Sequence, residues 1–254
     1  MSKFKTDAEI DLLRESGKRL ARVLQAVARE ITPGVTTKHL DEVADRLIRE
    51  TGDTPPFLNY TPHGARKPFP AALCVSVNDE IVHGIPASRV IEEGDIVSID
   101  LGLEHHGMIT DAALTIPAGK VTPEIAQLLK ETERSLYEGI KAIRVGGRVG
   151  DIGSAIERVA HAHGYGIVRE LGGHGVGHAV HEDPYIPNYG TKGTGPLLKA
   201  GMVIAIEPMF MLGHEDVRIM PDGYTVVSED GSFSAHFEHT IAITKDGAEI
   251  LTLP

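Results

Sequence analysis

Three histidines, His174, His178 and His181, fall within the short segment GGHGVGHAVHEDP at residues 172–184. The glycines of this segment disfavour a stable helix, because each glycine costs about 1 kcal/mol relative to alanine in a helix. Imidazole side chains bind metals and transfer protons near neutral pH. The segment is therefore a candidate for a loop that holds a metal or handles protons.

Four carboxylates stand at unusual places in apolar, strand-like runs. Asp100 lies inside IVSIDLGL, Asp111 opens DAALTI, Glu207 follows VIAI, and Glu238 precedes HTIAI. A carboxylate in such a strand is costly unless it is paired, hydrogen-bonded or bound to a metal. Any one of these acids could reach solvent at a strand end or form a core ion pair. Four of them together with the histidine segment favour a common site.

The charge of these acids indicates metal binding. No run of Lys or Arg lies near them in sequence, whereas two divalent cations would neutralise four carboxylates and leave room for a neutral imidazole. Oxygen-rich sites with one histidine suit Mn, Fe, Co or Zn. A two-metal site activates water at neutral pH and polarises a carbonyl. The residues therefore predict metal-assisted hydrolysis.

The elements that must position these residues form an α+β pattern. Apolar residues recur at helical spacing in residues 9–31 and 124–143, and further helices are expected at residues 38–50 and 151–164, with Thr37 as the cap of the second helix. Strand-like runs joined by short turns follow each helix pair, without βαβ alternation. We expect a mostly antiparallel sheet with paired helices on its outside.

The helix pairs also suggest an internal repeat. A constant shift that aligns Leu24 with Leu136 also aligns Gly34 with Gly146. Chance resemblance between amphipathic helices is the alternative explanation. We expect a single catalytic domain over residues 1–254, built from two related halves at about 1–120 and 121–254.

Composition limits the classes of function. The 254-residue chain carries a net charge of -11, which repels phosphate backbones and argues against a nucleic-acid substrate. Its one cysteine, Cys74, allows no intramolecular disulfide and fits a reducing compartment. The charged N-terminal residues resemble neither a signal peptide nor a membrane span. We expect a cytoplasmic protein with no membrane partner.

An ordered set of motifs resembles type I methionine aminopeptidase, a peptidase family with the pita-bread fold. The resemblance runs from about Glu9 to the C-terminus and is carried by VHGIP, DIVSIDLG, TDAALT, GGHGVGHAVHEDP, GMVIAIEP and FEHTIAIT. It implies the creatinase/aminopeptidase-like architecture, in which two pseudo-symmetric halves surround a dinuclear metal site with a curved antiparallel sheet and outer helices. That architecture agrees with the repeat.

The resemblance implies a complete ligand set for two divalent ions, drawn from Co, Mn, Fe or Zn. The implied ligands are Asp100, Asp111, His174, Glu207 and Glu238. By the family pattern, Asp111 and Glu238 bridge the metals, and Asp100 holds one ion through both oxygens.

The resemblance also implies three catalytic residues. Glu207 is the general base for a metal-bound water, while His83 in VHGIP and His181 in VHEDP contact the scissile amide and stabilise the tetrahedral intermediate. His83 and His181 are therefore expected to bind substrate as well.

A methionine pocket is implied at three further positions. Cys74, Phe69 and Tyr224 match pocket residues of the family, and Tyr224 stands where a Trp is common. Cys74 could equally be a small buried core residue. The Phe69 match depends on the loop YTPHGARKPFPAAL, whose length departs from the family.

Several residues depart from the family pattern. His178 stands where Arg or Lys is usual, Val180 replaces a Phe, and Thr110 replaces a Gly. We expect His178 at the surface or behind the site, a changed substrate pocket at Val180, and an altered turn at Thr110. His105 and His106 are expected to form a solvated hairpin tip.

These resemblances predict an aminopeptidase that removes the N-terminal methionine when the second residue is small. Its expected partners are N-terminal Met peptides and nascent chains, with the ribosome as the place of action, and we expect a monomer. The alternatives are an Xaa-Pro peptidase of the same fold, which usually carries an extra N-terminal domain not expected here, a non-catalytic peptide-binding protein on this scaffold, and a metal-storage protein. The presence of all five ligands argues against a binding protein.

Overall fold

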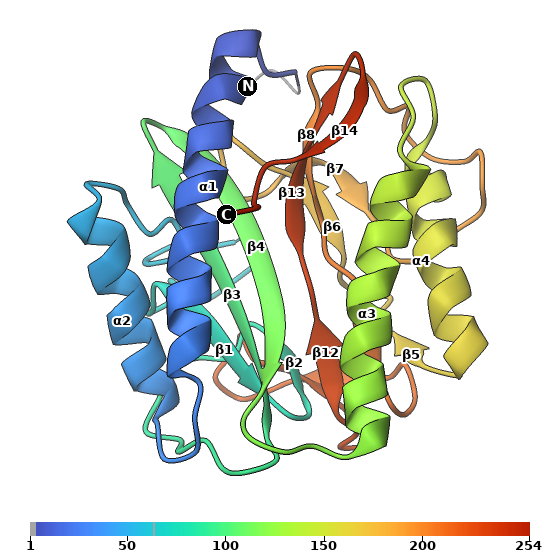
Figure 1. Cartoon of the computed structure of the whole chain (residues 1–254). Helices are drawn as coiled ribbons and strands as arrows, with labels where there is room; N and C mark the ends of the chain where they lie inside the picture. Colours follow the sequence, from blue (N-terminus) through green and yellow to red (C-terminus); the bar gives the residue numbers. More distant parts are fainter. Residues whose placement is uncertain (1–3, 63) are drawn as a thin grey trace.

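Two pairs of helices lie over the strands in the computed structural model, which describes residues 4–62 and 64–254 (Figure 1). The first pair is α1 (Asp7–Glu30) and α2 (Thr37–Glu50), and the second pair is α3 (Pro123–Ala142) and α4 (Val149–His163). All four helices coincide closely with the predicted segments. The shift that aligns Leu24 with Leu136 also places the end of α1 on the end of α3 and the start of α2 on the start of α4.

Capping residues define where the first two helices begin. The hydroxyl of Thr6 accepts a hydrogen bond from the Glu9 N–H, and the Glu9 carboxylate accepts one from the Thr6 N–H, so α1 starts with a capping box. The prediction that Thr37 caps α2 is wrong by one residue, because Thr36 accepts from the backbone N–H of the third residue of α2. The Thr37 hydroxyl instead bonds to the backbone of Ala87.

The strands pair antiparallel throughout and form one larger sheet in each half, with two small sheets beside them. The first-half sheet has the order β1-β3-β4 and contains β1 (Leu73–Val77), β3 (Ile96–His105) and β4 (Met108–Pro117). The second-half sheet has the order β14-β13-β8-β6-β7 and contains β6 (Gly173–Gly175), β7 (Glu182–Ile186), β8 (Val203–Ile206), β13 (His239–Thr244) and β14 (Gly247–Ile250). One small sheet has the order β10-β11-β2 and contains β2 (Glu80–Val82), β10 (Val217–Ile219) and β11 (Val226–Ser228). The other has the order β12-β9-β5 and contains β5 (Gly166–Ile167), β9 (Met209–Met211) and β12 (Ser234–His236).

The two halves meet where β4 runs beside β13 at the centre of the molecule (Figure 1). Ala113 and Glu238 exchange backbone hydrogen bonds of 2.8 and 3.4 Å across this junction. The hydroxyl of Thr240 accepts from the Asp111 N–H and donates to the Asp111 carbonyl oxygen, at 2.9 and 2.7 Å. These bonds bring the strand that carries Asp111 directly against the segment that carries Glu238.

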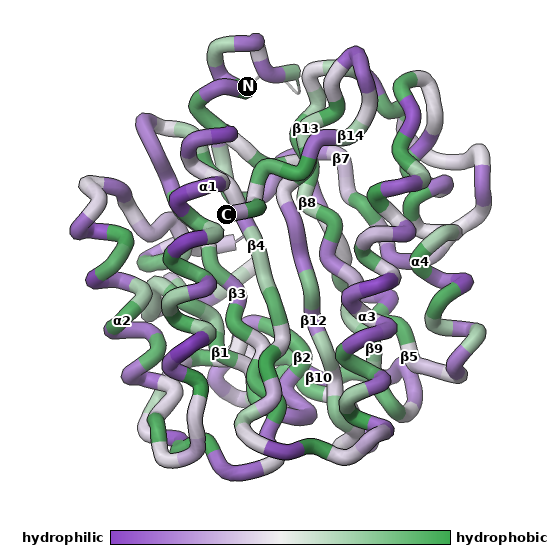
Figure 2. Tube along the Cα trace, in the orientation of Figure 1, coloured by the Kyte–Doolittle hydropathy of each residue, from purple (hydrophilic) through white to green (hydrophobic). Residues whose placement is uncertain are grey.

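Each helix pair encloses a core of its own against the neighbouring sheet. One core packs α1 and α2 against β1, β3 and β4, and the other packs α3 and α4 against the second-half strands. Figure 2 shows both hydrophilic and hydrophobic residues along the helices, as expected for helices that bury one face. The structure therefore confirms the predicted α+β class, with an antiparallel sheet and outer helices. No helix in the described ranges has the length and apolar character needed to cross a bilayer.

The β3–β4 hairpin corrects one expectation about its tip. His106 and Gly107 form the turn with positive φ angles, whereas His105 is the last residue of β3 and is buried. The Nδ1 atom of His105 lies 2.7 Å from Oδ1 of Asp53. The expectation that His105 is solvated is therefore wrong, because the chain turns one residue later.

Candidate metal centre and active site

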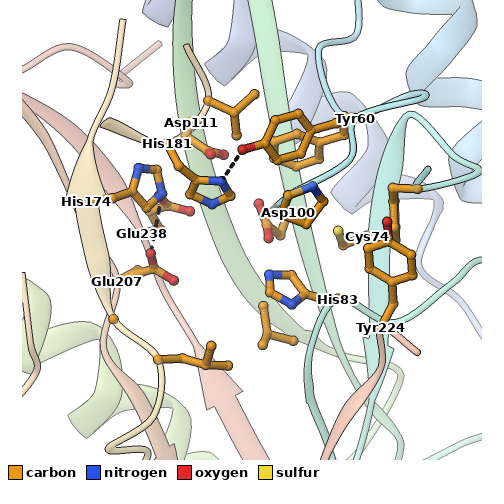
Figure 3. Close-up of a pocket in the computed structure, with 17 residues that line it drawn as sticks. Tyr60, Cys74, His83, Asp100, Asp111, His174, His181, Glu207, Tyr224 and Glu238 are labelled. Carbon is orange, nitrogen blue, oxygen red and sulfur yellow. Dashed lines mark hydrogen bonds and ion pairs between the residues drawn. The ribbon is translucent and has the colours of Figure 1, made fainter. Parts of the chain in front are cut away.

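One cavity gathers every residue that the sequence singled out for catalysis, metal binding or substrate binding (Figure 3). These residues come from both halves of the chain. They are Phe69, Cys74, His83, Asp100, Asp111, His174, His181, Glu207, Tyr224 and Glu238. Their shared location is an observation, while the role of each residue stays a prediction.

Asp100 and Asp111 reach the cavity from neighbouring strands. In the β3–β4 register Asp100 lies opposite Ala113, and Asp111 lies opposite Gly102, so the two acids are diagonal neighbours on one face. Cys74 of β1 lies opposite Asp100 on the other side of β3. The pleat therefore turns all three side chains toward the cavity.

Glu207 and Glu238 come from the second-half sheet. Glu207 directly follows β8, Glu238 directly precedes β13, and these strands pair with His239 opposite Ile206. The side-chain amide of Asn188, which is fully buried, donates to the Glu207 carbonyl oxygen at 3.0 Å. Strand pairing and this hydrogen bond hold both acids beside the two aspartates.

His174 lies on β6 with its ring orientation set by the backbone. Its Nδ1 atom donates to the carbonyl oxygen of Gly175 at 2.9 Å, which leaves Nε2 available as a ligand. That Nε2 lies 3.5 Å from Oε1 of Glu207. A side chain at Gly173 would collide with the Ala205 carbonyl, so glycine is what allows β6 to lie this close to β8.

The donor set fits a divalent metal. One ligand atom from each of Asp111, His174 and Glu238 lies within 4.8 Å of the other two, and all three residues are buried. Oxygens of Asp100, Asp111 and Glu238 have no hydrogen-bond partner among the described residues. Buried carboxylate oxygens without donors are costly, and a cation removes that cost.

The proton affinity of the carboxylates reflects their burial and mutual repulsion. Burial and the neighbouring charges of Asp111 and Glu207 raise the pKa of Asp100 well above its ordinary value, and burial and the same neighbours do so for Glu238. Burial raises the pKa of Asp111 to about 6. These protons must leave when a cation binds, so metal affinity should rise with pH.

Glu207 differs from the other acids. Burial acts to raise its pKa, but the nearby imidazoles of His236 and His174 outweigh that effect and lower it. His236 is buried, and its Nε2 lies 3.6 Å from Oε2 of Glu207. Glu207 therefore remains ionised more readily than the other three acids, so its carboxylate is available to accept a proton at neutral pH.

His83 and His181 approach the cavity from opposite halves. His83 follows β2 with a φ of 60°, and Gly84 after it lies so close to the Val75 carbonyl that no side chain would fit. Burial lowers the pKa of His83 to about 4, and the surrounding protein together with His174 lowers the pKa of His181 to about 4. Both imidazoles are therefore neutral at pH 7 and can each donate one hydrogen bond.

Tyr60 is a cavity residue that sequence reasoning missed. Its hydroxyl lies 2.9 Å from Nδ1 of His181 (Figure 3), and the two ring centroids are 5.4 Å apart. Tyr60 lies in an irregular loop with no periodic pattern. The local sequence around Tyr60 does not indicate a functional residue, so only the tertiary structure reveals its contact with His181.

The cavity also has an apolar wall, which begins beside Asp100 at its cross-strand neighbour Cys74. Phe69 and Tyr224 pack edge to face with centroids 5.2 Å apart, and Phe57 and Cys74 complete the wall. Burial raises the pKa of the Cys74 thiol well above its ordinary value, so Cys74 remains a neutral apolar group. The cavity thus combines a polar, acid-rich side with an apolar pocket.

The departures from the family pattern fall in three different environments. Val180 lines the cavity, whereas His178 turns to α1 and places Nε2 2.7 Å from Oε1 of Glu9. Thr110 is fully buried against α1, with its hydroxyl 2.9 Å from the hydroxyl of Ser16. Thr110 therefore contributes to helix packing and not to the cavity.

Comparison with known proteins places the chain and its fold in a family. A model of metallopeptidase family M24 matches residues 11–245, and the chain belongs to this family. A methionine aminopeptidase of Clostridium perfringens is 45% identical over 98% of this chain and 98% of the relative. The crystal structure of methionine aminopeptidase from Rickettsia prowazekii covers 100% of both chains with a TM-score of 0.95 and 38% identity. Within family M24, the chain is a member of the methionine aminopeptidases, and the predicted type I resemblance and pita-bread fold are confirmed.

A more distant similarity concerns the fold alone. Prolidase from Pyrococcus furiosus matches 99% of this chain and 65% of that chain, with a TM-score of 0.78 and 24% identity. The scaffold is therefore shared with a proline-specific enzyme. This similarity shows the fold alone, because fold similarity does not define a substrate. The family assignment depends on the relatives with higher identity.

Proposed function

We propose that the cavity in Figure 3 is the active site at which this metal-dependent aminopeptidase removes N-terminal methionine. One observation carries the proposal: five potential ligands converge next to an apolar pocket, and three of their buried carboxylates each have one oxygen without a hydrogen-bond partner among the described residues. The acids suit a cation, and the apolar pocket suits an apolar side chain such as methionine.

We propose that two divalent ions are held by Asp100, Asp111, His174, Glu207 and Glu238. Bound metal would lower the pKa of water and polarise the scissile carbonyl. The identity of the ions depends on availability, because the donor set suits Mn, Fe, Co and Zn.

The protein groups then have separate roles. Glu207 accepts the proton of the attacking water, since its lowered pKa keeps it ionised. His83 and His181 donate to the scissile amide and to the oxygen that becomes negative, since both are neutral near pH 7. Tyr60 holds the His181 ring through Nδ1.

The methionine side chain binds against Phe69, Tyr224 and Cys74. Tyr224 is fixed by a short hydrogen bond from its hydroxyl to the Lys67 carbonyl oxygen, and Phe69 is buried against it. Val180 stands at the edge of the same cavity. We propose that the second residue of the substrate is small, as in the Met-Ala-Ser peptide used below.

The remaining expectations belong to the same proposal. Residues 1–254 act as one catalytic domain, because ligands from both halves complete the site. The substrates are N-terminal Met peptides and nascent chains at the ribosome, and the enzyme acts as a monomer in the reducing cytoplasm.

The test is release of free methionine from a Met-Ala-Ser peptide by protein stripped with a chelator and titrated with Mn²⁺, Fe²⁺, Co²⁺ or Zn²⁺. We expect no activity without metal and activity that saturates at two ions per chain by calorimetry. Glu207→Gln, which keeps the size of the side chain, should lower kcat by about 10²–10⁴. Cleavage of Xaa-Pro peptides but not of Met-Ala-Ser would refute the assignment, and full turnover by protein free of metal would refute the mechanism.

A further inference from the structure

We propose that Lys5, acting through Glu182, is a positioning residue for His181. The inference rests on the proposed role of His181 in catalysis and concerns the loop between β6 and β7. The side chain of Lys5 is 0% exposed, and its Nζ atom lies 2.6 Å from Oε2 of Glu182. Burial of an ammonium group is costly, so this pair needs a structural reason.

The same carboxylate holds the backbone of the histidine loop. Oε1 of Glu182 accepts hydrogen bonds from the N–H groups of His178 and Ala179, at 2.7 and 3.1 Å. Glu182 is also the residue directly after His181. One oxygen of Glu182 therefore closes the loop on itself, while the other ties it to Lys5.

The N-terminal segment is itself anchored against this loop. The Lys5 N–H donates to the Gly201 carbonyl oxygen at 2.7 Å. Gly177 of the loop has a φ of 142°, and a side chain there would collide with the Lys5 stem. The loop thus packs directly on the side chain of Lys5, and the Lys5–Glu182 ion pair holds the loop in this position.

A second contact joins the same two segments. Nε2 of His178 lies 2.7 Å from Oε1 of Glu9, and the other oxygen of Glu9 closes the capping box of α1 with Thr6. This contact joins the side chain of His178 to α1 and is separate from the two backbone N–H bonds that the loop makes to Glu182. The Lys5–Glu182 ion pair is therefore the main contact between the N-terminal segment and the loop, and the His178–Glu9 contact supports it.

Lys5 does not line the cavity, so its effect on the reaction can reach the substrate only through the loop. A displacement of about 1 Å in a catalytic group can lower the rate about 100-fold. We expect Lys5→Met and Glu182→Gln each to lower kcat about 10- to 100-fold at saturating metal, with Mn²⁺ affinity changed by less than about threefold.

The experiment measures kcat and KM for Met-Ala-Ser, Mn²⁺ affinity and urea unfolding for Lys5→Met and Glu182→Gln, alone and combined with His181→Ala. The matched control is Arg14→Met. Arg14 of α1 forms a two-pronged ion pair with Glu249 of β14, at 2.7 and 2.8 Å, and so ties α1 to the second half without touching the loop. Its loss should lower stability and leave kcat within about twofold.

The decisive result is non-additivity. In the His181→Ala background, Lys5→Met should lower kcat by less than about twofold, because the group that it positions is gone. An equal loss in both backgrounds, or a loss no larger than that of Arg14→Met, would overturn the proposal. If Lys5→Met does not fold, Glu182→Gln supplies the same comparison. A wild-type protein without metal-dependent methionine release would refute the proposed function instead, whereas an active wild type with unaffected variants refutes only this inference.

Discussion

Asp111→Asn should stabilise the metal-free protein at neutral and basic pH while abolishing its activity. The ordinary pKa of this carboxyl group is 3.8, and burial raises it to about 6 in the folded protein. The folded state therefore binds more protons than the unfolded state between pH 4 and pH 6. The contribution of Asp111 to stability therefore falls as pH rises through that interval and is level above it.

The size of the effect follows from the two pKa values. The difference between 3.8 and about 6 corresponds to about 3 kcal/mol, because one pKa unit is worth about 1.4 kcal/mol. Asparagine carries no charge at either pH and keeps the shape of the side chain. The variant should therefore gain up to about 3 kcal/mol over the wild type at pH 8 and almost nothing at pH 4.

The assay is urea unfolding in the presence of a chelator at both pH values. Asp246→Asn is the control, since Asp246 is exposed and outside the cavity. Calorimetry with Mn²⁺ should show that the stabilised variant has lost metal affinity. The reasoning is refuted if the difference between variant and wild type is the same at pH 4 and pH 8, or if the variant is less stable at pH 8.

Four further outcomes are expected. His174→Ala should lower metal affinity, whereas His181→Ala should keep it and lower kcat about 10²–10³, as calorimetry and turnover at saturating metal will show; the reverse pattern would exchange their roles. Tyr60→Phe should lower kcat up to about tenfold with unchanged metal affinity, because the contact to Nδ1 of His181 is lost; an unchanged kcat would exclude a role for the hydroxyl. Glu9→Gln should lower the free energy of unfolding by about 1 kcal/mol at pH 7 and not at all at pH 2. The capping N–H of Thr6 and the His178 side chain lower the pKa of Glu9 to about 2, so the stabilisation is lost as pH falls from about 4.5 to 2. A loss of stability in urea unfolding that does not depend on pH would contradict this. Thr110→Gly should cost about 1–3 kcal/mol in urea unfolding without changing metal affinity, because a fully buried hydrogen bond to α1 is lost; weaker metal binding would place Thr110 in the site.

The acids were the part of the site that residue type and strand pattern alone could reveal, whereas the roles of the histidines came from the family resemblance. Asp100 and Asp111 break apolar strands, and such a break is costly wherever it occurs, so the residue type alone marks the position. The register of the β3–β4 hairpin then follows from its short turn, and it places both acids on one face. Glu207 and Glu238 carry the same local signal at strand ends.

The contacts that hold the site in shape left no such signal. Lys5 and Glu182 are 177 residues apart, and either would be an ordinary surface residue in its own local sequence. Tyr60 reaches His181 from a loop in the other half, 121 residues away. Pairings of this kind depend on how the two halves of the chain pack against each other, and neither periodicity nor residue type encodes that relation.

Strand parity explains the two surprises in the β3–β4 hairpin. Successive side chains alternate between faces, so Asp100 shares the cavity face with Gly102, while Leu101, Leu103 and His105 share the face under the helices. Thr110 falls on that helix face as well, because its cross-strand partner is Leu103. His105 is therefore buried for the same reason that Leu101 is, and Asp53 supplies the partner that its polar ring then requires. Alternation of side chains along the strands, starting from Asp100 and Asp111, would have placed His105 and Thr110 on the helix face. The two histidines beside a glycine suggest an exposed turn only when this alternation is ignored.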